Sequence, residues 1–138
     1  MLDDPEFSRW RKDGDSALRS AQLQADAGLY NWACFAAEQA AQLAVKALLH
    51  GIGAAPWGHD LEELGRRAHE AGVPVDDERR AALLRLKRHY IPARYADAHP
   101  GGAASDQYVD SDARAAIADA EAILAFVDDA WKLSLIHI

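Results

Sequence analysis

The sequence contains little cysteine and no long apolar run. Its 138 residues include one cysteine, Cys34, so an internal disulfide is excluded. No apolar stretch approaches the roughly 18 residues that would indicate a membrane-spanning helix. The first residues also lack the basic segment followed by an apolar core that is typical of a secretory signal. We therefore expect a soluble cytoplasmic protein.

Proline and glycine are scarce as well, with 5 and 9 residues, whereas half of the residues are hydrophobic. Together with abundant alanine, this composition favours packed helices over sheet. A chain of this length suits one domain with its own core, so folding requires no metal staple. His69 and Glu70 lack the second histidine of a zinc-protease helix, and the other histidines are dispersed. We expect no metal and no other cofactor.

Positive charge is limited overall but concentrated in one segment. The net charge of −7 argues against a protein that coats nucleic acid with its whole surface. Residues 79–94, RRAALLRLKRHYIPAR, nevertheless contain no acidic residue. They carry the basic residues Arg79, Arg80, Arg85, Lys87, Arg88 and Arg94. A local basic segment on an acidic protein predicts a site for an anion.

Helical spacing of apolar residues predicts an all-α bundle of about five helices. The first helix begins at Asp4 and Pro5 and ends at Gly28; the second runs from about Tyr30 to His50 and is closed by Gly51. Their short connection predicts an antiparallel hairpin. The second helix is apolar on nearly every face, so we expect it at the centre of the bundle.

Three further helical patterns follow. A third helix is expected from Asp60 to Gly72, and a fourth begins at Asp76 and must bend or end at Pro92. The last helix begins near Asp110 and repeats apolar residues with 4-3-4-3-4 spacing. Those residues are Ala113, Ile117, Ala120, Leu124, Val127 and Trp131.

The domain is predicted to comprise residues 1–131. Residues 132–138, KLSLIHI, depart in composition from the preceding sequence. We interpret them as a tail that is not native to the domain.

Several segments, taken in order, resemble HEPN domains. The second helix, YNWACFAAEQAAQLAVKALL, resembles a HEPN helix with an aromatic residue, a Gln-Ala-Ala run and a Lys-Ala-Leu-Leu ending. GHDLEEL resembles the family's Gly-His-Asp-Leu turn, and RYADA resembles its Arg-Tyr-Pro-Asp-Ala signature. Tyr108 and the final segment ARAAIADAEAIL complete the ordered set. The resemblance extends from about Ala17 to Phe126.

This resemblance implies a small all-α domain that usually forms a homodimer. HEPN proteins are often encoded beside a minimal nucleotidyltransferase, as two halves of a toxin–antitoxin pair. Many are metal-independent ribonucleases with an Arg-x4-6-His motif, and others bind nucleotides or partners without catalysis. Arg94 and His99 fit the motif with four intervening residues.

The Arg94–His99 pair suits RNA cleavage chemically. Histidine can move protons near neutral pH, and arginine can stabilise phosphoryl charge with a fixed fork of donors. The spacing alone carries little information, because a chain with this many arginines and histidines is expected to contain such a pair by chance. Tyr95 also occupies a position where nuclease members commonly have a small polar residue.

Backbone geometry limits how this pair can meet. On an unbroken helix, positions i and i+5 point about 140° apart. Pro100 disfavours helical geometry at His99, so the helix is expected to end by that residue. His99 would then fold back beside Arg94, or two copies would meet across a dimer axis, as the resemblance implies.

Phosphate contact is expected on the outer face of the fourth helix. Arg80, Lys87 and Arg94 are seven residues apart and therefore lie within about 20° per step of one another on a helix. With Arg88 and Tyr95, they form the predicted phosphate- or RNA-binding set. A structural alternative is that Arg94 caps the end of that helix or pairs with Asp97.

Other polar residues have structural interpretations. Glu38 and Gln39 are expected to make buried hydrogen bonds, and Cys34 is expected to be a small core residue. His59 is expected to help start the third helix and to pack against Trp57.

Three functional hypotheses follow. The first is a dimeric binding module that engages a nucleotidyltransferase and holds a nucleotide or RNA phosphate. The second is a ribonuclease with Arg94 and His99 at a dimer interface. The third is a non-catalytic structural helical dimer.

Overall fold

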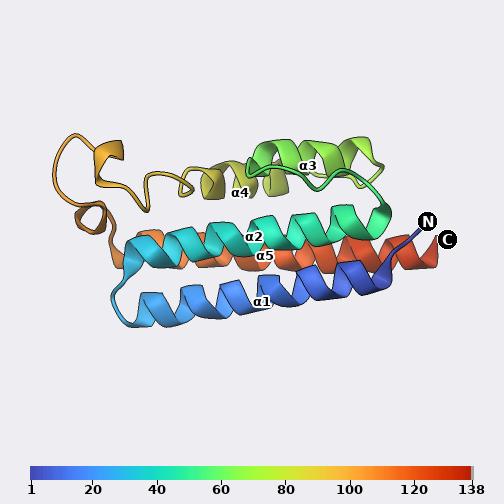
Figure 1. Cartoon of the computed structure of the whole chain (residues 1–138), viewed down its shortest axis with the longest axis horizontal. Coiled ribbons are helices and arrows are strands. Elements are labelled where there is room, and N and C mark those ends of the chain that lie inside the picture. The colour runs from blue at the N-terminus through green and yellow to red at the C-terminus, as the bar shows by residue number, and fades with distance from the viewer. Residues whose placement is uncertain (138) are drawn as a thin grey trace.

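The computed structural model describes residues 1–137, and within them every regular element is helical (Figure 1). The α-helices are α1 (Asp4–Asp26), α2 (Tyr30–Ile52), α3 (Leu61–Glu70), α4 (Asp77–Lys87) and α5 (Asp110–Ile136). Two short 3₁₀ turns, η1 (Ala96–Ala98) and η2 (Ala104–Gln107), interrupt the connection between α4 and α5. The prediction of an all-α bundle of five helices is confirmed.

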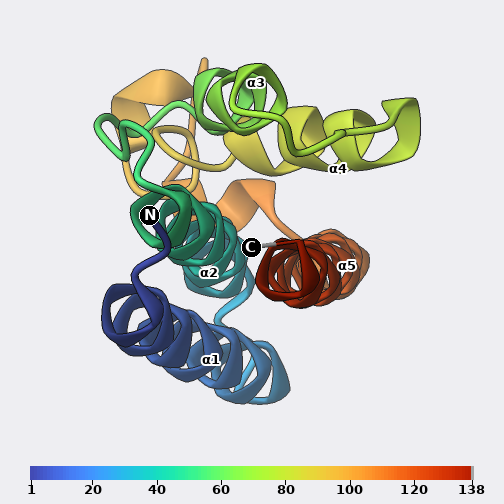
Figure 2. The same ribbon diagram turned by 90° about the vertical axis from the view of Figure 1, so that its right-hand side faces the viewer.

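The helices form three layers. The α1–α2 antiparallel hairpin is confirmed, and α5 lies beside α2 in the middle layer (Figures 1 and 2). The shorter α3 and α4 cover the side of this layer opposite α1. The N-terminus and the last turns of α5 lie at one end of the bundle, and the α4–α5 connection extends toward the other end (Figure 1).

Helix α2 is central, as its sequence predicts, because it contacts each of the other four helices. Small side chains allow this close approach: seven alanines of α2 are buried, together with Leu48 and Leu49. The apolar repeat of α5 is also confirmed, since all six of its predicted positions are buried.

Several helix ends differ by a residue or two from the sequence prediction, and those of α1 and α2 are instructive. Asp3, rather than Asp4, caps α1, because its Oδ1 accepts a hydrogen bond from the Glu6 backbone nitrogen at 3.2 Å. The α2 helix continues past Gly51 to Ile52, and Gly53, whose φ of 76° suits glycine, is its C-cap.

Gly51 has a packing role instead. A Cβ atom at this position would lie 2.5 Å from Cζ3 of Trp131. The Trp131 ring is itself stacked on Phe7, with 4.4 Å between ring centroids. Gly51 therefore makes room for the aromatic contact that joins α1, α2 and α5.

The predicted tail begins as a continuation of α5. The helix extends to Ile136, and Leu133, Leu135 and Ile136 on it are exposed. Ile138 lies outside the described residues. That residues 132–138 are not native stays a prediction. Within residues 1–137, no helix has the length and apolarity required to cross a membrane.

Candidate functional site

The α4 helix ends at Lys87, well before the candidate arginine. The following backbone makes tighter turns: His89 N donates to Leu86 O at 2.9 Å, and Tyr90 N donates to Lys87 O at 3.2 Å. Pro92 lacks an N–H donor and its ring clashes with a continuing helix. The expectation that Arg94 extends the helical face of Arg80 and Lys87 is therefore wrong.

A buried hydrogen bond fixes the turn that carries Arg94. Asn31, at the start of α2, donates its Nδ2 to the carbonyl of Ala93 at 2.9 Å. Both residues are buried, with 4% of Asn31 and none of Ala93 exposed. Sequence reasoning missed Asn31, although a polar residue one turn before Phe35 on a mostly apolar helix was a usable signal.

The guanidinium of Arg94 lies among three aromatic rings, which we call the aromatic cage. Its Cζ atom lies 4.4 Å from the ring centroid of Phe35, 4.6 Å from that of Tyr90 and 5.0 Å from that of Tyr95. Each distance is within the range of a cation–π interaction. The cage combines one ring from α2 with two from the turn.

Arg94 also makes one hydrogen bond, from Nε to the Tyr90 carbonyl at 2.8 Å. Tyr90 lies beyond the end of α4 at Lys87, so this bond does not cap that helix, and the structural alternative of a capping role is wrong. In the described part of the chain, Arg94 has no ion pair with Asp97 or any other carboxylate, and its two terminal nitrogens have no hydrogen-bond partner. These nitrogens therefore retain their donors for a ligand.

A buried carboxyl group interacts electrostatically with Arg94. Glu38 of α2 is completely buried and accepts hydrogen bonds from Gln42 Nε2 at 2.7 Å and Gln39 Nε2 at 2.8 Å. Burial raises the pKa of Glu38 to about 7, although both glutamines, Arg94 and Lys46 act in the opposite direction. The hydrogen bonds predicted for Glu38 and Gln39 are present, but only the bond from Gln42 is fully buried, and the bond from Gln39 is partly buried.

His99 folds back, but its contact is with the chain rather than with Arg94. Its Nε2 lies 2.6 Å from the carbonyl oxygen of Pro92. This carbonyl accepts only from a protonated Nε2, which leaves Nδ1 as the nitrogen available for proton transfer. No hydrogen bond joins Arg94 and His99 among the described residues. Instead, each binds a carbonyl of the same turn, at Tyr90 and Pro92.

The Tyr108 ring lies close to both His99 and a second histidine, His89. The Tyr108 ring is 6.2 Å from the His99 ring and 5.8 Å from the His89 ring, measured between centroids. Burial lowers the pKa of His89, and its Nδ1 is buried without a hydrogen-bond partner in the described structure. Sequence reasoning did not identify His89, which lacks a recognisable motif.

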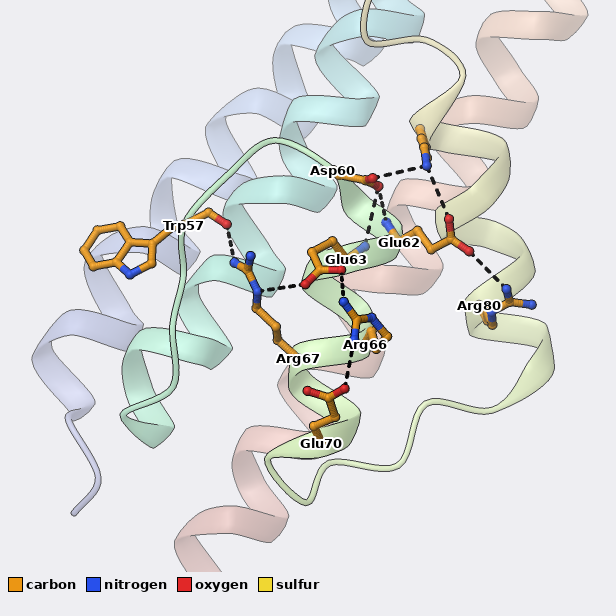
Figure 3. Close-up of polar contacts among 9 residues, drawn as sticks. Trp57, Asp60, Glu62, Glu63, Arg66, Arg67, Glu70 and Arg80 are labelled. Atoms are coloured by element: carbon orange, nitrogen blue, oxygen red, sulfur yellow. Dashed lines mark hydrogen bonds and ion pairs between the residues drawn. The ribbon is translucent and has the colours of Figure 1, made fainter.

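Most of the basic residues in segment 79–94 already have acidic partners. Arg80 Nη2 lies 3.0 Å from Glu62 Oε2 (Figure 3), and Lys87 Nζ lies 3.2 Å from Asp60 and 3.3 Å from Glu62. Arg79 pairs with Asp76 and Glu78, and Arg85 pairs with Asp119. Among the arginine and lysine residues of this segment, only Arg88 and Arg94 lack an ion pair within residues 1–137.

The start of α3 supplies the acidic partners of Arg80 and Lys87. Asp60 caps it by accepting from the backbone nitrogen of Glu62 at 3.0 Å. Glu63 pairs with both Arg66 and Arg67, and Arg67 also donates to the Trp57 carbonyl (Figure 3). The positive charges of Arg80 and Lys87 are therefore balanced by acidic residues that lie 18 to 27 positions earlier in the chain.

His59 and Cys34 are the remaining residues for which the sequence predicted a structural role. The His59 ring stacks on Tyr90, with 5.3 Å between centroids and 16° between planes, whereas the Trp57 side chain is 71% exposed and forms no aromatic pair with His59 among the described residues. Cys34 is fully buried, and burial raises the pKa of its thiol to about 12, in agreement with a core role. Across residues 1–137, no group of three or more His, Cys, Asp or Glu residues has an arrangement suited to a metal ion.

Comparison with known proteins gives a consistent result. The HEPN domain model matches residues 7–130. The crystal structure of TT1696 from Thermus thermophilus is 40% identical, with a TM-score of 0.87, and the match covers 90% of this chain and 97% of that one.

Two further solved structures resemble the chain. ST0689, an archaeal HEPN homologue, is 29% identical with a TM-score of 0.76, covering 89% of this chain and 95% of that one. A HEPN domain protein from Thermotoga maritima is 28% identical with a TM-score of 0.72, covering 88% and 95%. Among curated proteins there is no significant match. The length of the domain match and the agreement in fold establish that this chain belongs to the HEPN domain family.

Proposed function

We propose that this HEPN protein binds the phosphate of a nucleotide or RNA through Arg94. The observation that supports this most strongly is the aromatic cage, which orients the guanidinium without a carboxylate partner in the described residues. An arginine held in this way presents a planar fork of donors that matches phosphate oxygens. An incoming phosphate would not have to displace an existing ion pair.

The neighbouring basic residues contribute unequally to phosphate binding in this proposal. Arg88, at the C-terminal end of α4, is exposed and lies six residues before Arg94 in the sequence. Arg80 and Lys87 must exchange their contacts with Asp60 and Glu62 before they can bind a phosphate closely. Arg94 and Arg88 are therefore the primary phosphate ligands, Tyr95 supports Arg94, and Arg80 and Lys87 add long-range attraction.

Membership of the family supports the wider assignment. We propose that the chain forms a homodimer and acts in the cytoplasm with a minimal nucleotidyltransferase, as one half of a toxin–antitoxin-type pair. Size-exclusion chromatography with light scattering would measure the oligomeric state. Copurification with a nucleotidyltransferase encoded beside the gene would test the pair, and its absence from a stable complex would oppose this part of the proposal.

Phosphate binding is testable with fluorescent single-stranded RNA and ATP at two salt concentrations. We expect Arg94→Ala to weaken binding about tenfold or more, whereas Arg19→Ala, which removes an exposed arginine of α1, has little effect. Binding through phosphate contacts should also weaken as salt rises. If both variants bind like the wild type, Arg94 is not the ligand. If neither probe binds the folded wild type, the structural-dimer hypothesis is favoured.

A second candidate function is metal-independent RNA cleavage. It is favoured by the contacts of Arg94 and His99 with one turn of the chain. The two side chains bind the carbonyls of Tyr90 and Pro92, which are two residues apart. Arg94 would stabilise the phosphoryl charge, and His99 would act either as general base that deprotonates the RNA 2′-hydroxyl or as general acid that protonates the leaving 5′-oxygen. The two side chains would form a composite site across the proposed dimer axis.

Cleavage is tested by incubating RNA with the purified protein in EDTA. We expect an active wild type to lose its activity in both Arg94→Ala and His99→Ala. Activity that survives His99→Ala would remove the catalytic role of that histidine. Binding without cleavage in the wild type would leave the binding module as the function.

A further inference from the structure

A groove lies between the loop before α3 and the segment after α4. It has a volume of about 630 Å³, within the roughly 300–1,000 Å³ typical of small-molecule pockets. Leu84, Ile91 and Pro92 form its apolar lining, and 47% of Ile91 is exposed. An apolar groove of this size suits a flat, largely apolar ring.

The groove also has an aromatic wall. His59 and Tyr90 both line it, and their rings are stacked with 16° between planes. Tyr90 belongs to the aromatic cage as well, since its ring centroid lies 4.6 Å from Arg94 Cζ. The groove and the candidate phosphate ligand therefore share a side chain.

The charged lining completes the chemical description. Lys87 and Asp60 are paired with each other at 3.2 Å, so their charges largely balance. Arg88 also lines the groove and, within residues 1–137, has no ion pair. The unbalanced charge at the groove is therefore positive, which complements an anionic ligand with an aromatic ring.

We propose that this groove binds the base of a nucleotide whose phosphate contacts Arg88 and Arg94. The inference rests on the proposed phosphate-binding function and adds a base subsite to it. The base lies against His59, Ile91 and Pro92, and stacking makes the subsite tolerant of base identity. The occupant is a single free ribonucleotide.

The test compares the four ribonucleoside 5′-monophosphates with ribose 5-phosphate and inorganic phosphate by calorimetric titration. We expect at least one nucleotide to bind about fivefold or more tightly than ribose 5-phosphate, because a stacked base contributes favourably. His59→Ala and Ile91→Ala should remove this advantage without changing the affinity for ribose 5-phosphate. Leu23→Ala is the matched control, because Leu23 is an exposed apolar residue of α1, 57% exposed.

The outcomes separate the two proposals. If ribose 5-phosphate binds in an Arg94-dependent manner and no nucleotide binds more tightly, the base subsite is wrong and the phosphate site stands. If the nucleotide advantage survives both groove substitutions, the base lies elsewhere. If none of the probes binds the folded wild type, the proposed function fails, and the base subsite fails with it. Circular dichroism of each variant confirms that it is folded.

Discussion

Asn31 and Ala93 are joined by a hydrogen bond of 2.9 Å that links the first turn of α2 to the turn carrying Arg94. The two residues are 62 positions apart in the sequence. Because the bond is buried, water cannot replace it readily. The position of Arg94 therefore depends on a residue that contributes no charge of its own.

We expect Asn31→Ala to lower the free energy of unfolding by about 1–3 kcal/mol, because it leaves the buried Ala93 carbonyl without a donor. Urea denaturation would measure the change. Gln22→Ala, at an exposed position of α1, should change stability by less than about 0.5 kcal/mol. A similar loss in the two variants would show that the hydrogen bond does not anchor the turn.

Glu38 should make stability depend on pH. Its pKa is about 7 in the folded protein and about 4.3 in an unfolded chain. The folded state therefore retains a proton that the unfolded state releases, so the contribution of Glu38 to stability is greatest below about pH 4.3 and declines until about pH 7. The slope contributed by Glu38 reaches about 1.4 kcal/mol per pH unit between these values.

The Glu38→Gln variant tests this linkage, because glutamine does not titrate. We expect the difference in unfolding free energy between variant and wild type to shift in favour of the variant as pH rises from 4.5 to 7. Chemical denaturation at several pH values measures this shift. A difference that stays constant across that range would contradict the raised pKa of Glu38.

Glu62 should restrain the anion affinity of the basic segment. It contacts both Arg80 and Lys87, so Glu62→Gln would release Arg80, leave Lys87 paired with Asp60 alone and remove one negative charge. We expect RNA affinity at low salt to rise about two- to fivefold and the gain to shrink at high salt. The loss of stability should be below about 1 kcal/mol, because these pairs are exposed.

The matched control is Glu121→Gln, which changes the net charge equally at an exposed position of α5. An equal gain in RNA affinity from both variants would point to net charge alone. A gain confined to Glu62→Gln would show that the paired cations lie close to the bound strand.

Gly51→Ala should be destabilising even though alanine favours a helix. The added Cβ would lie 2.5 Å from the Trp131 ring, which is held by its stack on Phe7. We expect a net loss of about 1–3 kcal/mol from overpacking. Thermal unfolding would measure this loss. At Gly14 the nearest atom to an added Cβ is 3.4 Å away, so Gly14→Ala should cost less; the reverse order would contradict the packing explanation.

Local sequence patterns predicted the helices well because periodicity and end signals act over a few residues. The six-position repeat of α5 and the antiparallel hairpin are examples. The end of α2 was predicted two residues early, because Gly51 and Gly53 both resemble a helix stop. Only the position of Trp131, on a distant helix, shows that Gly51 is required for packing.

The candidate site was harder to predict because its contacts are not local. Arg94 was identified, but its contacts with Phe35 and the anchoring bond of Asn31 depend on how α2 meets the turn. The basic stripe appeared free in sequence because Asp60 and Glu62, which balance it, precede it on another helix. Linear charge distribution therefore overstated the free positive charge.

The placement of the chain ends has a practical consequence for measurement. The N-terminus and the last turns of α5 lie together at one end of the bundle, whereas the α4–α5 connection extends toward the other (Figure 1). A fluorophore or surface tether attached at the N-terminus would therefore be separated from the α4–α5 connection, which includes the turn carrying Arg94, by much of the length of the long helices. Immobilised protein should leave that turn accessible to nucleotide and RNA probes.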